Sequence, residues 1–99
     1  MMIKVIEIID SKGTVLICKF NNQEIKSIDF DQYKFHDKFI EKIIETDQLK
    51  DVRIGDLGQL YWPGQATIQE INGEISFIDY DVSAEFVYIN STFDEPSMV

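Results

Sequence analysis

The sequence predicts a single α+β domain, and three observations carry this prediction. Short apolar, β-branched runs separated by turn residues fill the first thirty positions, which is typical of strands. A helical spacing of apolar residues follows near residues 36–46. An Asn-Gly pair between two apolar-rich runs then predicts a β-hairpin. We therefore expect a three-stranded antiparallel meander, one amphipathic helix packed on the sheet, further short strands and a hairpin.

The length and composition of the chain fit one domain with a hydrophobic core. Its 99 residues are 44% hydrophobic and 12% aromatic, and a chain of this kind needs neither disulfides nor a structural metal to fold. The single cysteine, Cys18, lies in an apolar run and is predicted to be a buried, inert thiol. We place the domain at residues 1–92 and expect a flexible tail at residues 93–99.

The first half of the chain divides into three strands and a helix. Apolar runs predict strands over residues 3–9, 14–20 and 24–30, and the short connections between them favour an antiparallel meander. In the helix, charged side chains occupy the positions between the apolar ones. Asp37 is predicted to cap this helix or to lie in its first turn. The apolar positions are Phe35, Phe39, Ile40, Ile43 and Ile44.

Short strands are predicted over residues 51–54 and 59–62 of the second half. Pro63 is predicted to end the later strand, because proline cannot donate a hydrogen bond within a sheet. The Pro63-Gly64 pair favours a type II turn. For residues 83–90 the pattern leaves two alternatives open, a helical turn that begins near Ser83 or an edge strand over residues 87–89.

The hairpin around Asn72-Gly73 is the clearest local signal in the chain. With a two-residue loop, Ile68 is paired with Phe77, and opposed residues point to the same face of a sheet. One face of the hairpin should then pack against the protein and the other should be open to solvent. The expected packed face holds Ile68, Ile75 and Phe77, and the expected solvent face holds Gln69 and Ser76.

Charge is distributed unevenly along the chain. Residues 1–50 hold eight lysines and nine carboxylates, a net charge of −1, whereas residues 51–99 hold one arginine and nine carboxylates, a net charge of −8. Because phosphate binding depends on Lys and Arg, the acidic second half is a poor candidate for nucleic-acid contact. An acidic surface attracts a basic protein or keeps the domain in solution.

The sequence predicts a cytoplasmic protein that does not enter a membrane. The first ten residues lack the long apolar core of a signal peptide and include Glu7. No stretch reaches the roughly 18 apolar residues that a membrane-spanning helix needs.

Two segments of the second half resemble the closing motif of a small bacterial family, domain of unknown function 2442. Residues 58–63 (Gly-Gln-Leu-Tyr-Trp-Pro) and 81–88 (Asp-Val-Ser-Ala-Glu-Phe-Val-Tyr) match its two parts, with residues 65–80 inserted between them. Ala84 and Val87 stand where the family has Pro and Leu. The resemblance implies a fold of three strands, a helix and two strands, and no established activity; some members look like partners of small toxin-like proteins. It implies structural roles for Gly58, Trp62, Pro63, Gly64, Asp81, Ser83, Glu85 and Tyr88.

The sequence offers few groups for catalysis or metal binding. The pairs Asp29/Asp31 and Asp79/Asp81 each place two carboxylates on one side of an extended segment. Such pairs can hold Mg²⁺ or Ca²⁺, although these ions need more oxygen ligands than one pair supplies. His36 has no His or Cys companion for a transition metal. We therefore predict no enzymatic activity, no cofactor and no metal site.

We expect a non-catalytic module that binds a protein partner or forms a homodimer through its acidic second half. Two alternatives stay open: an antitoxin-like neutraliser of a small basic protein, and a metal-binding or enzymatic domain that uses an Asp pair. Trp62 either faces a partner or packs over the core at the end of its strand. The candidate partner-binding residues are Tyr61, Trp62, Gln69, Glu70, Glu74 and Ser76.

Overall fold

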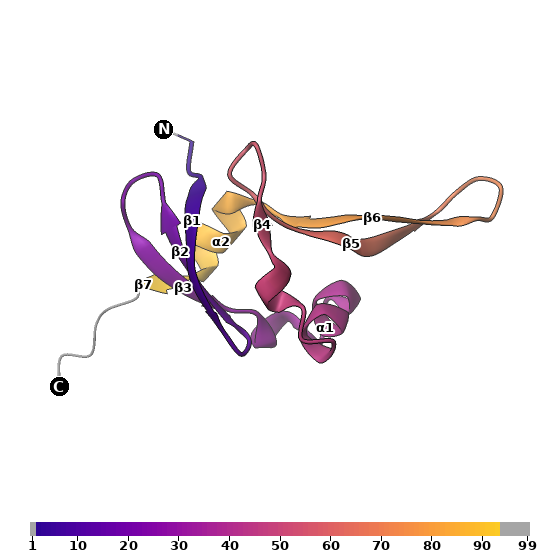
Figure 1. The fold of residues 1–99 in the computed structure, drawn as a ribbon, viewed down its shortest axis with the longest axis horizontal. Helices are drawn as coiled ribbons and strands as arrows, with labels where there is room; N and C mark the ends of the chain where they lie inside the picture. Colours follow the sequence, from indigo (N-terminus) through magenta and orange to yellow (C-terminus); the bar gives the residue numbers. More distant parts are fainter. Residues whose placement is uncertain (1, 94–99) are drawn as a thin grey trace.

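Residues 2–93 are described by the computed structural model, in which they form two antiparallel sheets and two short helices (Figure 1). The first sheet has the strand order β1-β2-β3-β7, and the second has the order β4-β5-β6. The predicted α+β class, with a three-stranded meander, a helix and a hairpin, is therefore confirmed. The elements are β1 (Val5–Lys12), β2 (Val15–Phe20), β3 (Ile25–Asp29), a 3-10 turn (Phe30–Tyr33), α1 (Lys38–Glu45), a second 3-10 turn (Leu49–Asp51), β4 (Arg53–Ile54), β5 (Leu60–Gln69), β6 (Ile75–Val82), α2 (Ala84–Asn90) and β7 (Thr92–Phe93).

The meander packs one face against the core because buried apolar side chains alternate with more exposed ones along its strands. In β2, Leu16, Cys18 and Phe20 are buried and the residues between them are half-buried, as expected where successive side chains point to opposite faces. The edge strand β1 pairs with β2 with two register shifts, one after Val5 and one after Ile8. These irregularities are β-bulges, which bend and twist an edge strand.

One contiguous core draws side chains from both sheets and both helices. Trp62 of β5 is its largest fully buried side chain. The Trp62 ring lies edge-on to the Phe30 ring, with 5.6 Å between their centroids. The indole N–H of Trp62 donates a hydrogen bond of 3.1 Å to the carbonyl oxygen of Leu49, so the one polar atom of this buried side chain is satisfied.

Helix α1 begins where Asp37 caps it, as predicted. The Asp37 carboxylate accepts hydrogen bonds from the backbone N–H groups of Phe39 and Ile40, which have no partner within the helix. The buried residues of α1 are Ile40 and Ile43. The second oxygen of Asp37 accepts a hydrogen bond from the hydroxyl of Tyr80, which joins the start of α1 to β6.

For residues 83–90 the sequence allows a helical turn or an edge strand, and the structure has a helix, α2. Ser83 accepts the backbone N–H of Phe86 and caps this helix, and Ala84 and Val87 are buried. The helix contacts β3 of the meander, and Lys26 of β3 donates a hydrogen bond of 2.7 Å to the carbonyl oxygen of Tyr88. Beyond α2, Phe93 belongs to β7 and pairs with β3, so the sheet includes one residue beyond the predicted domain boundary at residue 92. The other residues of the predicted tail, 94–99, lie outside the described part of the chain.

Strand β5 does not end at Pro63, contrary to the prediction. It continues to Gln69, and its pairing with β6 shifts register between Trp62 and Ala66. This bulge accommodates Pro63, because β4 pairs with β5 only at Leu60 and Tyr61, and no other strand of residues 2–93 requires an N–H donor at residue 63. Gly64 has a φ of 68°, and its N–H donates to Asp79 Oδ1 at 3.2 Å.

The predicted register of the β5–β6 hairpin is wrong by one residue. The N–H of Glu70 donates to the carbonyl of Glu74 at 2.7 Å, and the N–H of Gly73 donates to the carbonyl of Glu70 at 2.9 Å. The loop therefore holds the three residues 71–73, with Gly73 at a φ of 87°. This is a type I turn followed by a glycine bulge, the common three-residue alternative to a two-residue loop.

The corrected register changes which side chains share a face. Ile68 does not lie on the same face as Ile75 and Phe77, because a shift of one residue moves a side chain to the opposite face. The cross-strand pairs are Ala66–Ile78, Thr67–Phe77, Ile68–Ser76 and Gln69–Ile75.

We expect Tyr80→Phe to destabilise the protein by about 1.5–3 kcal/mol, the usual contribution of a hydrogen bond to a charged group. Urea unfolding followed by Trp62 fluorescence measures this loss. Tyr61→Phe is the matched control, because no hydrogen bond of the Tyr61 hydroxyl is found among residues 2–93, and it should change stability by less than about 0.5 kcal/mol. Equal effects of the two substitutions would contradict the role of the Tyr80–Asp37 bond.

The same bond predicts a pH dependence. Burial, the hydrogen bond to Asp37 and the negative charges of Asp37 and Asp81 all raise the pKa of Tyr80 above its usual value. A pKa that is higher in the folded than in the unfolded state gives stability that is present below about pH 10 and is lost as the pH rises further. The free energy of unfolding should therefore fall more steeply above pH 10 in the wild type than in Tyr80→Phe.

Candidate protein interface

The β5–β6 hairpin projects from the body of the molecule (Figure 1). We term residues 65–81 the arm. Its base is held by Trp62 and Tyr80, a cross-strand pair whose ring centroids are 6.0 Å apart. The molecule measures 56 × 30 × 20 Å along its principal axes. Beyond the base, the two strands of the arm extend past α1 along the longest of these axes.

Large apolar side chains are exposed along the arm. Five of them each retain at least 41% of their accessible surface. The cross-strand pairs place Ile68 and Ile78 on one face and Ile75 and Phe77 on the other. The exposed residues are Ile68, Ile71, Ile75, Phe77 and Ile78.

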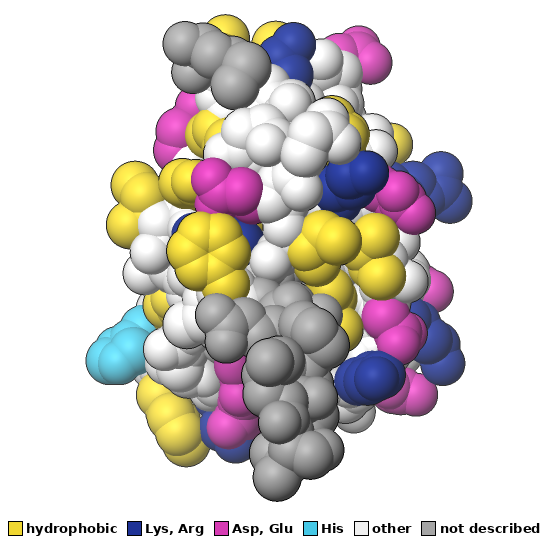
Figure 2. All heavy atoms as spheres, turned by 90° about the vertical axis from the view of Figure 1, so that its left-hand side faces the viewer, with side chains coloured by type: hydrophobic (Ala, Val, Ile, Leu, Met, Phe, Trp, Pro, Cys, Tyr) yellow, Lys and Arg dark blue, Asp and Glu magenta, His cyan; other side chains and the backbone are white. Residues whose placement is uncertain are grey.

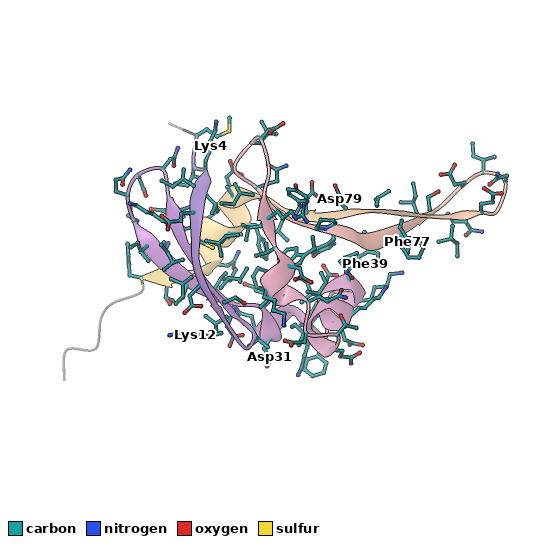
Figure 3. All side chains as sticks on the ribbon, viewed as in Figure 1. Lys4, Lys12, Asp31, Phe39, Phe77 and Asp79 are labelled. Atoms are coloured by element: carbon teal, nitrogen blue, oxygen red, sulfur yellow. The ribbon has the colours of Figure 1, made fainter. Side chains whose placement is uncertain are left out.

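The sequence pattern does not identify these apolar residues as site residues. Its prediction of a packed face that holds Ile68, Ile75 and Phe77 is wrong, because all three side chains are exposed. A two-stranded hairpin without a covering layer is only marginally stable in water. Within residues 2–93, no element covers either face of the distal part of the arm. The nearest element is α1, where Phe39 lies on the side that faces the arm (Figure 3). Lys42 Nζ of α1 lies 6.0 Å from the centroid of the Phe77 ring.

The polar residues predicted to bind a partner lie mostly on the arm. Gln69, Glu70 and Glu74 are exposed next to the loop. Ser76 is half-buried, and its hydroxyl donates a hydrogen bond of 2.7 Å to Glu70 Oε1 across the hairpin. The structure therefore brings these four residues together near the end of the arm.

The other two predicted partner-binding residues lie at the base of the arm. Tyr61 is half-buried and opposite Asp81. Trp62 is completely buried, so its side chain belongs to the core and offers no surface to a partner in this structure. Of its two predicted roles, the structure shows the packing role.

The residues of the family-like motif lie at the base of the second sheet and in or next to helix α2. Gly58 accepts the N–H of Val5 at 3.0 Å and so connects the β4–β5 turn to the meander. The Tyr88 hydroxyl donates to Glu24 Oε1 at 3.0 Å, and its ring packs edge-on to that of Phe20. Pro63 and Gly64 form the bulge, Asp81 pairs with Tyr61, Ser83 caps α2, and Glu85 lies exposed in the first turn of that helix.

Every charged residue of the arm is acidic. Its charged residues are Glu70, Glu74, Asp79 and Asp81, and it contains no Lys or Arg. The opposite end of the molecule differs, because hydrophobic side chains there are interspersed with side chains of both charges (Figure 2). The arm therefore combines exposed apolar groups with charge of a single sign.

A cleft of about 410 Å³ lies at the base of the arm, between the first 3-10 turn, the start of α1, the end of β6 and the start of α2. Four aromatic side chains line its wall. Its polar groups include Asp37 and Ser83, and both already cap helices. His36 lies at the same cleft and is exposed. The aromatic residues are Phe30, Tyr33, Tyr80 and Phe86.

The two Asp pairs have local partners in the fold. Asp29 Oδ1 accepts hydrogen bonds from Thr14 Oγ1 and from the backbone N–H of Asp31. Asp31 forms an ion pair of 3.0 Å with Lys34. Asp79 accepts the N–H of Gly64 in the bulge. Within residues 2–93, no group of three or more His, Cys, Asp or Glu side chains has an arrangement that could hold a metal ion.

Cys18 is buried, as predicted. Burial raises the pKa of its thiol to about 12, because the thiolate would lose its hydration inside the core. The thiol is therefore neutral in the folded protein at pH 7, and the nucleophilic form is the thiolate.

No protein-family model, curated protein or solved structure matches this chain. The resemblance to domain of unknown function 2442 therefore stays a prediction, and the candidate interface rests on the geometry described above. None of the helices in residues 2–93 has the length and apolar character needed to cross a lipid bilayer.

Two glycines with a positive φ allow a test of the connection between the sheets. A Cβ on Gly58 (φ 77°) would lie 2.7 Å from the Cα of Lys4, whereas a Cβ on Gly64 (φ 68°) would have no atom within 4 Å. Both alanine substitutions bear the cost of a left-handed backbone, about 1–2 kcal/mol. We expect Gly58→Ala to cost about 1–3 kcal/mol more than Gly64→Ala, the typical penalty of overpacking. Thermal unfolding of both variants measures the difference, and equal melting temperatures would contradict it.

Proposed function

We propose that this chain is a non-catalytic protein-binding or assembly module of the cytosol, and that the arm is its contact surface. The observation that carries the proposal is the set of five large apolar side chains exposed on a projecting, two-stranded hairpin. Exposed apolar surface of this kind marks sites of protein interaction. A partner that covers both faces of the arm would supply the layer that the hairpin itself lacks.

The strength of such an interaction can be estimated by comparing the free energy gained from apolar burial with the free energy that association costs. Fully burying one Ile or Phe side chain contributes about 1.5–3 kcal/mol, so five partly exposed side chains offer on the order of 5 kcal/mol. Association costs roughly 4–15 kcal/mol in translational and rotational freedom. Apolar contact alone therefore gives at most a weak complex, and polar contacts of the arm must add to it.

An antitoxin-like neutraliser of a small basic protein is the second candidate function. It is favoured by the charge of the arm, which carries four carboxylates and no Lys or Arg. Electrostatic attraction would speed the association and make it sensitive to salt. A metal-binding or enzymatic role for an Asp pair has less support, because Asp29, Asp31 and Asp79 are engaged by local hydrogen bonds or an ion pair.

Site-specific photocrosslinking in cells tests the proposal. Photoreactive benzoylphenylalanine at position 77 should give covalent adducts of defined mass with a partner protein or with a second copy. The same group at Phe35, which is 81% exposed but lies outside the arm, is the matched control and should give none. Adduct formation that falls as salt is raised in a lysate would favour the basic partner.

Two outcomes would contradict the proposal. One is the absence of adducts at position 77 under conditions in which the protein is folded. The other is the same set of adducts at positions 77 and 35, which would show non-specific contact by any exposed ring.

A further inference from the structure

The strand edges of the molecule are protected unequally. Natural sheets protect their edges with short strands, bulges, proline or lysine, since an open edge pairs readily with another chain. Here β4 and β7 are two residues long, β1 has two bulges, and β5 has Pro63 within its bulge. β6 has eight residues, Ile75–Val82, with no proline or lysine. Among the strands of residues 2–93, β6 alone is a long, regular and unprotected edge.

The hydrogen-bond pattern shows which groups of β6 face outward. Glu70 and Glu74 form a hydrogen-bonded pair next to the loop. In an antiparallel ladder, hydrogen-bonded and non-hydrogen-bonded pairs alternate. The pairs Gln69–Ile75 and Thr67–Phe77 are therefore of the non-hydrogen-bonded kind. Ile75 and Phe77 direct their backbone N–H and C=O groups away from β5, towards the open edge.

The charges along this edge are ordered. The residues from 75 to 78 carry no charge and include Ile75, Phe77 and Ile78. Glu74 precedes them, and Asp79 and Asp81 follow them. The edge is thus apolar in its middle and negative at both ends.

We propose that the open edge of β6 binds an extended segment of another protein as an added strand, and that this segment is apolar in its middle and basic at both ends. The inference deepens the proposed function, on which it rests. Strand addition supplies main-chain hydrogen bonds, which are the polar contacts that the apolar side chains of the arm need. A second copy of this chain is a poorer occupant, because two arms would bring together eight carboxylates without a single Lys or Arg.

A dye-labelled octapeptide, Lys-Lys-Val-Thr-Val-Ile-Lys-Lys, serves as the probe, and fluorescence anisotropy with the full-length protein measures its binding. We expect saturable binding that weakens as salt is raised, since exposed charges are screened. The control peptide has Glu in place of each Lys and should bind at least tenfold more weakly. Absent binding of the lysine peptide, or equal binding of the two peptides, would overturn the proposal.

Two proline variants locate the binding edge. Ile75→Pro removes an outward N–H from β6, whereas Gln69→Pro removes the corresponding outward N–H from β5 on the opposite edge of the same pair. Ile75→Pro should weaken binding at least tenfold, and Gln69→Pro should leave it within twofold of the wild type. Trp62 fluorescence checks the folding of both. An equal loss in the two variants would show that strand addition to β6 is wrong.

A charge variant keeps the test valid if proline disturbs the hairpin. Glu74 is exposed at the end of the edge, so Glu74→Lys should weaken binding of the lysine peptide several-fold and reduce its dependence on salt. An unchanged affinity would overturn the predicted order of charges.

The remaining outcomes separate this inference from the proposed function. Sedimentation of the wild type as a dimer that Ile75→Pro converts to a monomer would identify a second copy as the occupant and overturn the inference. Specific crosslinks at position 77 without peptide binding would keep the arm as an interface and reject strand addition. Absent crosslinks together with peptide binding would instead reject the cellular role.

Discussion

The burial of Trp62 is the constraint on which the rest of the structure depends. Its ring packs against Phe30, in the first 3-10 turn, and against Tyr80 on the neighbouring strand. Its indole N–H donates a hydrogen bond to the carbonyl oxygen of Leu49. One side chain therefore joins the first 3-10 turn, which follows the meander, to the second 3-10 turn and to both strands of the hairpin. A residue this large has few ways to be buried, so the base of the second sheet is fixed where Trp62 enters the core. The bulge begins immediately after it, and the arm leaves the body of the molecule from that point.

A second connection fixes how α1 sits beneath the arm. Asp37 uses one carboxylate oxygen to begin the helix and the other to accept the hydroxyl of Tyr80. The helix start and the base of β6 are thus held by the same side chain. Only the base of the arm is covered in this way, because the exposed residues lie beyond Tyr80. The division between a well-packed body and an uncovered arm follows from where these two connections end.

The sequence predicted the fold class and most elements because their signals are local. Apolar alternation, helical spacing and an N-terminal cap are each properties of a few adjacent residues. The errors arose where non-local pairing decides the outcome. Pro63 lacks an N–H donor, but this ends a strand only where a neighbouring strand needs that donor. The antiparallel strand β4 begins at Arg53, opposite Tyr61, and so does not reach the position opposite Pro63. The Asn-Gly pair suits two loop lengths, and here Asn72 accepts the N–H of Glu74 within the longer one. That single added residue moves the side chains of β5 to the opposite face relative to those of β6. With the shorter loop, Ile68, Ile75 and Phe77 share one face that is expected to be packed, so the sequence predicts only the polar residues of the arm as a binding surface.

The unprotected edge of β6 also has a consequence for the colloidal behaviour of the protein. Identical open edges can template one another into a continuous cross-β ladder, as in amyloid. Long-range repulsion between molecules of net charge −9 opposes this. Acidification that protonates the carboxylates, or salt that screens them, removes this barrier while the edge stays intact. The acidity of the chain thus acts as a kinetic barrier that keeps the open edge of β6 from pairing with other copies of the chain.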